Sequence, residues 1–152
     1  MKFSVVICTY SMDMYDEFQD AVESITEQTY DDIEIVLVSD GNTEVYNQIQ
    51  SDYGDRSDTI VTMTNENVGI SAARNHGIEA ATGDIVGQID DDAVAEPDWV
   101  KELVSVYEKR DAIAAGGKMT PLWVSGKPDF LPEEFYWLIG VTHRGFAEPG
   151  EE

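Results

Sequence analysis

Cysteine is almost absent from this chain of 152 residues. Cys8 is the single one, which excludes an intramolecular disulfide and a cysteine-based zinc site. It lies in the apolar run Val5-Val6-Ile7-Cys8, so we expect a buried, inert thiol. Long hydrophobic runs are missing too, since no segment approaches the roughly 20 apolar residues of a membrane span. One lysine precedes a short strand-like run at the N-terminus, so we expect neither signal peptide nor membrane span, and a soluble, cytoplasmic domain.

Basic residues are scarce: 9 Lys and Arg stand against 31 Asp and Glu, for a formal net charge of −22. Such a surface repels nucleic acid and anionic lipid headgroups, so nucleic acid is excluded as a partner. The acids are spread along the whole chain instead of forming a tail, and they oppose compaction unless salt screens them. This distribution resembles that of halophilic proteins, and we interpret it as adaptation to the solvent.

Apolar β-branched runs alternate with helical periods along the chain, and 42% hydrophobic residues suffice for a core. The pattern predicts strands at 3–8, 33–38, 59–63, 85–89 and 112–119, and helices at 14–28, 43–51, 70–81 and 97–108. Gly83 is expected to end the third helix in the left-handed conformation. The expected fold class is α/β and Rossmann-like, a mainly parallel sheet with helices on both faces.

Composition changes at Thr120, where an aromatic stretch punctuated by proline begins. We therefore divide the chain into a first domain at 1–119 and a second region at 120–152. The second region ends without a closing element, so we expect a truncated chain.

Polar clusters follow four of the predicted strands. In a parallel sheet the carboxyl ends of the strands lie at one edge, so these clusters should meet in one cleft. Each also has a simpler reading, as a turn, a helix cap or a solvated surface group. The clusters are Thr9-Tyr10, Asp40, the segment 65–69 with Arg74, and Asp90-Asp91-Asp92.

The aspartate triplet suits a hard cation, because Mg²⁺ and Mn²⁺ take oxygen ligands and are often shared between carboxylates and substrate phosphates. A solvated acidic turn is the alternative. A calcium loop is excluded, since counting from Asp90 places Ala95 and Lys101 where glycine and glutamate are required. Thr9-Tyr10 stands where a phosphoacceptor receiver domain needs acids, and the chain has neither a glycine-rich dinucleotide turn nor a P-loop.

Five ordered motifs give a specific resemblance. They are Val5-Val6-Ile7-Cys8-Thr9-Tyr10, Ser24-Ile25-Thr26-Glu27-Gln28-Thr29-Tyr30, Val36-Leu37-Val38-Ser39-Asp40-Gly41, the run from Asn67 to Gly77, and Asp90-Asp91-Asp92 with Pro97 and Trp99. Between residue 3 and about 100 the chain resembles the nucleotide-binding half of GT-A-fold, family 2 inverting glycosyltransferases. The resemblance implies a nucleotide-sugar (donor) binding domain at 1–119 and the start of an acceptor-side region at 120–152.

The resemblance implies a role for each matching residue. Thr9 and Tyr10 would line the base pocket, and Asp40 would accept a hydrogen bond from the base, with uracil favoured. Arg74 would approach the diphosphate. Asp90 and Asp91 would complete the donor site, with Asp90 near the ribose, while Asp92 would contact Mn²⁺ or Mg²⁺. The implied reaction is metal-dependent transfer, with inversion, from a nucleoside diphosphate sugar to a glycan or lipid-linked sugar. The full-length protein could then work at the inner face of the membrane.

Two departures from the family pattern matter. Ser39 stands where the family usually has a second acid, which leaves the base preference open. No general base is recognisable downstream, so we expect it outside this chain; the remaining carboxylates there are Glu133, Glu134, Glu148, Glu151 and Glu152. A noncatalytic nucleotide-sugar-binding module, or an isolated donor-binding fragment, is the alternative to a complete enzyme.

Overall fold

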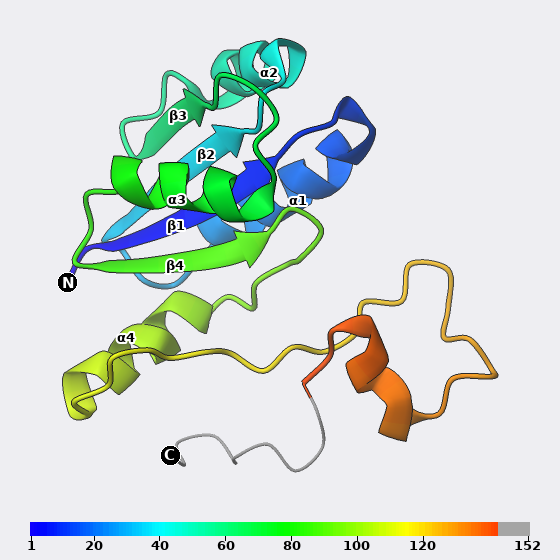
Figure 1. The fold of residues 1–152 in the computed structure, drawn as a ribbon. Coiled ribbons are helices and arrows are strands. Elements are labelled where there is room, and N and C mark those ends of the chain that lie inside the picture. The colour runs from blue at the N-terminus through cyan, green and yellow to red at the C-terminus, as the bar shows by residue number, and fades with distance from the viewer. Residues whose placement is uncertain (143–152) are drawn as a thin grey trace. The chain divides into compact units, whose positions relative to one another are not determined.

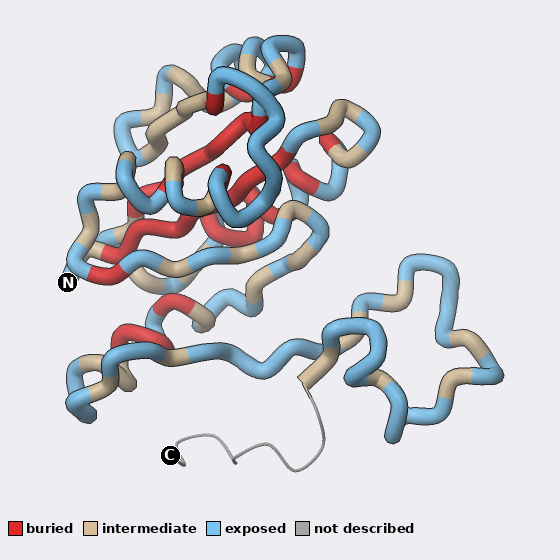
Figure 2. The backbone as a smooth tube through the Cα atoms, viewed as in Figure 1, coloured by how far each residue is buried: buried red, intermediate tan, exposed pale blue. Residues whose placement is uncertain are grey.

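The computed structural model describes residues 1–142. It forms two compact units, residues 1–104 and residues 105–152, which are described one at a time. The first contains the sheet and almost all of its helices, and every fully buried residue belongs to it (Figure 2). The second carries no buried residue between 105 and 142.

The first unit is built on four parallel strands in the order β3-β2-β1-β4 (Figure 1). Their bounds are Phe3–Thr9 for β1, Ile33–Ser39 for β2, Thr59–Met63 for β3 and Ile85–Asp90 for β4. The central strand β1 is buried along its whole length, as its unbroken apolar run predicts. Because all four strands run the same way, their carboxyl ends share one edge of the sheet.

Helices cover both faces of this sheet. A 3₁₀ turn at Met12–Met14 leads into α1 (Tyr15–Thr26), followed by α2 (Thr43–Tyr53), α3 (Ile70–Ala80) and α4 (Trp99–Lys109). In Figure 1, α3 crosses the front of β1 and β2 while α1 lies behind them. The rings of Phe18 on α1 and Tyr53 on α2 meet edge to face, with their centroids 6.3 Å apart.

The core on the α3 side is small and tightly packed. It contains Val6, Cys8, Val36, Val38 and Ala73. Gly77 lets the helix approach this closely, because an added Cβ would overlap Val6 and come within 2.9 Å of Val38 Cγ2.

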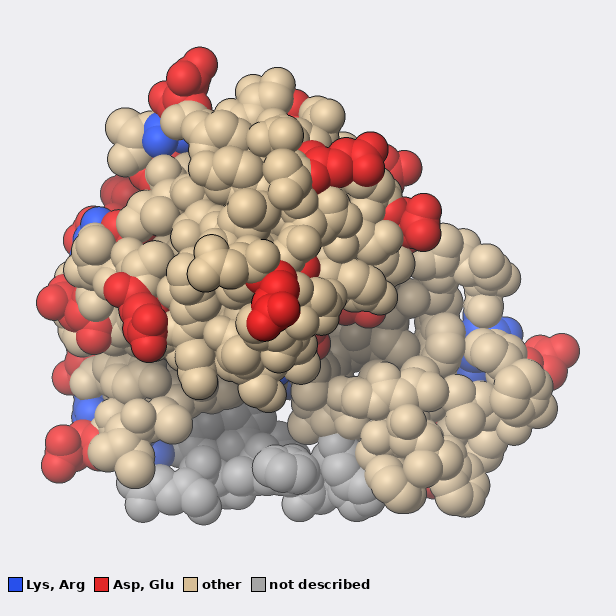
Figure 3. Space-filling view, turned by 45° about the horizontal axis from the view of Figure 1, so that its top comes forward, with Lys and Arg blue, Asp and Glu red and all other residues tan. Residues whose placement is uncertain are grey.

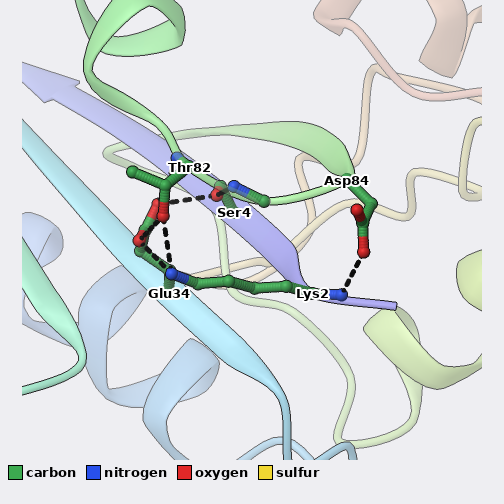
Figure 4. Close-up of polar contacts among 6 residues, drawn as sticks. Lys2, Ser4, Glu34, Thr82 and Asp84 are labelled. Atoms are coloured by element: carbon green, nitrogen blue, oxygen red, sulfur yellow. Dashed lines mark hydrogen bonds and ion pairs between the residues drawn. The ribbon is translucent and has the colours of Figure 1, made fainter.

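A buried carboxylate ties the amino ends of the strands together (Figure 4). Glu34 on β2 accepts hydrogen bonds from Ser4 Oγ at 2.7 Å, from the Thr82 N–H at 2.8 Å and from Thr82 Oγ1 at 2.6 Å, and it pairs with the Lys2 ammonium. Burial alone would raise the pKa of Glu34, but the hydrogen bonds from Lys2, Thr82 and Ser4 outweigh it and lower the pKa to about 2. The cluster links β1, β2 and the connection from α3 to β4.

Two expectations for local structure are wrong. The segment 112–119 forms no strand: in the described residues the sheet consists of β1 to β4, and apolar residues form a strand only where they pair with a neighbouring one. Gly83 is not left-handed; it is required by space, because a Cβ there would lie 2.6 Å from Ser4 Oγ and 2.8 Å from the Lys2 carbonyl oxygen. The other predicted strands and helices form within a few residues of their expected bounds.

In the second unit, the described residues that follow α4 form one 3₁₀ helix, Glu133–Ile139, and otherwise loops, turns and bends. Trp123 and Tyr136 pack edge to face with their centroids 5.4 Å apart, and the Lys127 ammonium lies 5.4 Å from the Tyr136 ring centroid. Within 1–142, no helix combines the length and the apolar character that crossing a bilayer requires. The functional boundary expected at 119 stays a prediction.

Candidate functional site

A pocket of about 510 Å³ opens at the carboxyl ends of the strands. Every residue around it belongs to the first unit. Its wall is formed by Cys8, Thr9, Tyr10, Asp40, Asn67, Gly69, Ile70, Ala73, Arg74, Asp90, Asp91 and Asp92. This is the edge at which ligands bind in open α/β sheets.

Asp40 lies at the end of β2 and is buried. Its Oδ1 accepts hydrogen bonds from Thr64 Oγ1 at 2.7 Å and from the Val68 N–H at 2.9 Å, while Oδ2 accepts the Gly69 N–H at 2.9 Å. A carboxylate offers about four acceptor positions, so these three bonds leave one, on Oδ2. The carboxylate can therefore serve the loop and one ligand donor at the same time.

Arg74 lies one turn into α3 and forms an ion pair with Asp90 at the end of β4. Both side chains line the pocket. Helix α3 begins at the pocket too, and its N-cap, Gly69, supplies no side-chain hydrogen bond to the first turn. The N–H groups of a helix's first turn lack partners within the helix, so this end of α3 favours an anion.

Asp91 is half-buried beside Thr9, the last residue of β1. Burial raises the pKa of the Asp91 carboxyl, and the nearby Thr9 hydroxyl opposes part of that rise. Thr9 Oγ1 is itself buried and has no hydrogen bond of good geometry within residues 1–142. Cys8, beneath them, is inert as expected, because burial raises the pKa of its thiol to about 12.

Asp92 is exposed at the pocket, and its carboxylate takes part in no hydrogen bond or ion pair within the described residues. Four aspartates and one arginine line the pocket, which gives a formal charge of 1 − 4 = −3. No group of three or more His, Cys, Asp or Glu side chains in residues 1–142 is arranged to hold a metal alone. A free carboxylate in an acidic pocket instead fits a cation whose other ligands come from water and phosphate.

The structure brings all seven sequence-predicted residues to one pocket: Thr9, Tyr10, Asp40, Arg74, Asp90, Asp91 and Asp92. What each of them binds stays a prediction. Two supporting residues were missed. Asn42 donates to the Tyr10 carbonyl oxygen at 3.0 Å and caps α2, and Thr64 bonds to Asp40. Asn42 carries a sequence signal, since asparagine before a helical period is a common N-cap; nothing in the sequence marks Thr64.

The carboxylates considered as general base belong to the second unit, whereas the pocket belongs to the first. Glu133 and Glu134 belong to the 3₁₀ helix of the second unit. Glu148, Glu151 and Glu152 lie outside the described residues. The expectation that the base lies outside this chain therefore stays a prediction.

Comparison with known proteins agrees with this architecture. Residues 4–143 match the family model "Glycosyl transferase family 2". The chain is 53% identical to "Glucosyl-dolichyl phosphate glucuronosyltransferase" from Haloferax volcanii, over 100% of this chain and 49% of that protein. It is 30% identical to an uncharacterized glycosyltransferase from Haemophilus influenzae, over 95% of this chain and 46% of that one. The chain thus spans about half the length of these relatives.

Among solved structures, S. aureus TarS (residues 1–349) is similar at a TM-score of 0.71 and 24% identity, covering 90% of this chain and 40% of that one. TarS has also been solved in complex with UDP and with UDP-GlcNAc. This likeness concerns the fold, and it matches the predicted GT-A arrangement. The chain belongs to glycosyl transferase family 2.

Proposed function

We propose that this chain forms the donor site of a glycosyltransferase that takes a sugar from a nucleoside diphosphate sugar. The observation that carries the proposal is the pocket: one arginine, an uncapped helix end and a free aspartate gather around a buried carboxylate with one acceptor position left. The arginine and the helix end suit a diphosphate, and the free aspartate suits a cation. The buried carboxylate suits an N–H group of the base. The UDP complexes of TarS support the same class of ligand.

The base would lie against Tyr10 and Asp40. Tyr10 is 59% exposed, so its ring is free to stack on a base. The remaining position on Asp40 Oδ2 would accept one N–H, which suits a uracil presenting N3–H between two carbonyl oxygens. Asp90 would face the ribose, and Arg74 would exchange part of its pairing with Asp90 for the diphosphate.

A divalent cation, Mn²⁺ or Mg²⁺, would bind at Asp92 and stabilise the charge that develops on the leaving diphosphate. The charge of the pocket supports this part of the proposal. At −3, the pocket opposes an anionic ligand, and Arg74 is the single cationic side chain on its wall. A divalent cation at Asp92 would change the charge of the pocket to −3 + 2 = −1, which weakens that opposition.

The acceptor and the sugar are proposed from the relatives. The name of the Haloferax volcanii protein describes transfer of a glucuronosyl unit to a glucosyl-dolichyl phosphate. We infer a lipid-linked acceptor of that class for this chain, at a membrane surface. Inversion by direct displacement is the proposed stereochemistry, with the acceptor hydroxyl attacking the sugar carbon as the bond to the diphosphate breaks.

A donor panel tests the proposal by calorimetry in buffered Mn²⁺ and molar KCl. UDP should bind more tightly than GDP and CDP by about tenfold or more, because cytosine presents an unprotonated N3 where uracil presents N3–H to Asp40, and guanine is larger. Equal affinity for all three nucleotides would contradict the assignment of Asp40 to the base. Adding UDP-glucuronate and measuring UDP release then separates an enzyme from a noncatalytic binding module, which would bind without turnover.

A further inference from the structure

The loop formed by residues 65–69 joins β3 to α3 and supplies one wall of the pocket. We propose that Asp40 and Thr64 together hold this loop in its binding conformation, with Thr64 as a positioning residue for the donor site. The proposal rests on the proposed function for its nucleotide readout only. Under this proposal Asp40 has two roles: it holds the loop and it contacts the base.

Burial of its own side chains does not hold the loop in its conformation. Residues 65–70 are all exposed, including the apolar side chains of Val68 (44%) and Ile70 (51%). Segments with little buried apolar surface open easily unless their backbone is anchored. The anchors must therefore be hydrogen bonds and backbone contacts to the rest of the domain.

Those anchors converge on the end of β2. The N–H groups of Val68 and Gly69 both donate to the Asp40 carboxylate at 2.9 Å. Gly41, with a φ of +68°, lets the loop backbone lie directly against it, since an added Cβ would overlap Glu66 and Asn67. Asp40 and Gly41 thus form one surface on which the loop rests.

Thr64 fixes Asp40 from the other side. Its own N–H donates to the Ser39 carbonyl oxygen at 3.1 Å, which continues the β2–β3 pairing and holds the residue in place. Its buried hydroxyl lies 2.7 Å from Asp40 Oδ1 and 2.8 Å from the Glu66 carbonyl oxygen. The hydroxyl thus contacts both the carboxylate that holds the loop and the loop itself.

The consequence for binding follows from preorganisation. Gly69 and Ile70 line the pocket and begin α3, so a displaced loop moves both the wall and the helix end that would face the diphosphate. A ligand that needs the ordered loop binds with an affinity reduced by the fraction of molecules that have it. Loss of one hydrogen bond to a charged group is large enough to lower the equilibrium constant between the ordered and the displaced loop about tenfold. The ordered fraction, and with it the affinity, then falls by up to the same factor.

The test uses the 152-residue chain in molar KCl and three variants. Thr64→Val removes the hydroxyl at nearly constant volume, Thr64→Ser restores it, and Thr59→Val makes the same change at the far end of β3, where the hydroxyl bonds to Asp58. Two readouts are taken: amide hydrogen exchange of residues 65–70 without ligand, and UDP affinity with Mn²⁺ present. Thermal melting confirms that each variant is folded.

We expect Thr64→Val to exchange the amides of Val68 and Gly69 about tenfold faster and to weaken UDP binding by up to that factor, in step with the loss of ordered loop. Thr64→Ser and Thr59→Val should stay close to the parent chain. Unchanged exchange in Thr64→Val would overturn the proposal. So would a change in UDP affinity that differs from the change in ordered fraction calculated from the exchange rates. If the parent chain binds no nucleotide, the proposed function fails, while exchange still decides whether Thr64 holds the loop. If Thr64→Val does not fold, Thr64→Ser against Thr64→Ala provides the same comparison.

Discussion

At the scale of single residues, Asp92 is the aspartate of the triplet best placed to bind a cation. Asp90 pairs with Arg74 and Asp91 is half-buried beside Thr9, while Asp92 is exposed and unpaired within residues 1–142. We predict that Asp92→Asn weakens UDP binding in Mn²⁺ at least tenfold and leaves melting unchanged, because an amide oxygen is a poorer ligand for a hard cation. The matched control is Asp55→Asn, which makes the same charge change at an exposed site; equal losses in both variants would contradict the assignment.

A substitution of Arg74 tests whether this residue binds the diphosphate of the nucleotide or its nucleoside. Replacing it by glutamine removes the one cation of the pocket wall and frees the Asp90 carboxylate, so the pocket becomes more negative. We predict that Arg74→Gln weakens UDP binding about tenfold or more and leaves uridine binding unchanged, since uridine carries no diphosphate. Parallel titrations with both ligands provide the measurement, with Arg56→Gln as the control because Arg56 pairs with Asp58 away from the pocket. A comparable loss for uridine would place Arg74 near the base instead.

At the scale of secondary-structure elements, Glu34 joins β1 and β2 to the segment after α3 (Figure 4). Its pKa of about 2 lies below the ordinary value of 4.5, so its stabilising effect is fully present above about pH 4.5 and is lost as the pH falls toward 2. We predict that Glu34→Gln lowers the free energy of unfolding by about 2–3 kcal/mol at pH 7. The deficit should shrink between about pH 5 and pH 2 in denaturant titrations.

The control for Glu34 is Glu79→Gln, an exposed position on α3. It makes the same charge change without breaking a buried pair, so its effect should be within about 0.5 kcal/mol at every pH. A deficit for Glu34→Gln that stays constant down to pH 2 would refute the ionic account and favour a packing role.

Gly77 allows α3 to lie close to the sheet. Alanine is the better helix former by about 1 kcal/mol, but its Cβ would overlap Val6. Overpacking of that kind costs about 1–3 kcal/mol, so we predict a net loss of up to about 2 kcal/mol for Gly77→Ala and a melting temperature lower by up to a few degrees. Asn75→Ala, on an exposed position of the same helix, should be neutral or slightly stabilising. A stabilised Gly77→Ala would show that the contact relaxes freely.

The strands and helices of the first unit could be predicted from sequence because each has a clear period and an apolar face. The same reasoning failed at 112–119, where apolar residues alone predicted a strand, because pairing depends on a neighbour that periodicity does not reveal. Asp40 was found from its position at a strand end. The hydrogen bonds of Asp40 to Thr64, Val68 and Gly69 could not be predicted from the sequence. They join residues 24 to 29 positions apart, whose contact depends on the folded sheet.

At the scale of the whole molecule, the net charge of −22 determines how the stability of the fold depends on salt. Nine basic residues cannot pair 31 acidic ones, and Figure 3 shows acidic side chains scattered over the face in view. Screening shortens the Debye length from ~10 Å at 0.1 M salt to ~3 Å at 1 M, which weakens their mutual repulsion. We predict a melting temperature that rises steeply across this range of KCl.

Two salts separate screening from general salting-out. Potassium chloride and potassium sulfate at equal ionic strength should raise the melting temperature alike up to about 1 M if screening is the cause, while sulfate should act more strongly if surface exclusion dominates. A melting temperature independent of KCl would refute the interpretation of the surface as adapted to high salt.

The central claim is that a pocket with a charge of −3 binds an anionic nucleotide through a divalent cation. The most direct measurement is calorimetric titration of the 152-residue chain with UDP at constant ionic strength, with Mn²⁺ and then with EDTA. The account predicts binding at least tenfold tighter with Mn²⁺, and loss of that difference in Asp92→Asn. Equal affinity for UDP with and without Mn²⁺ would contradict it.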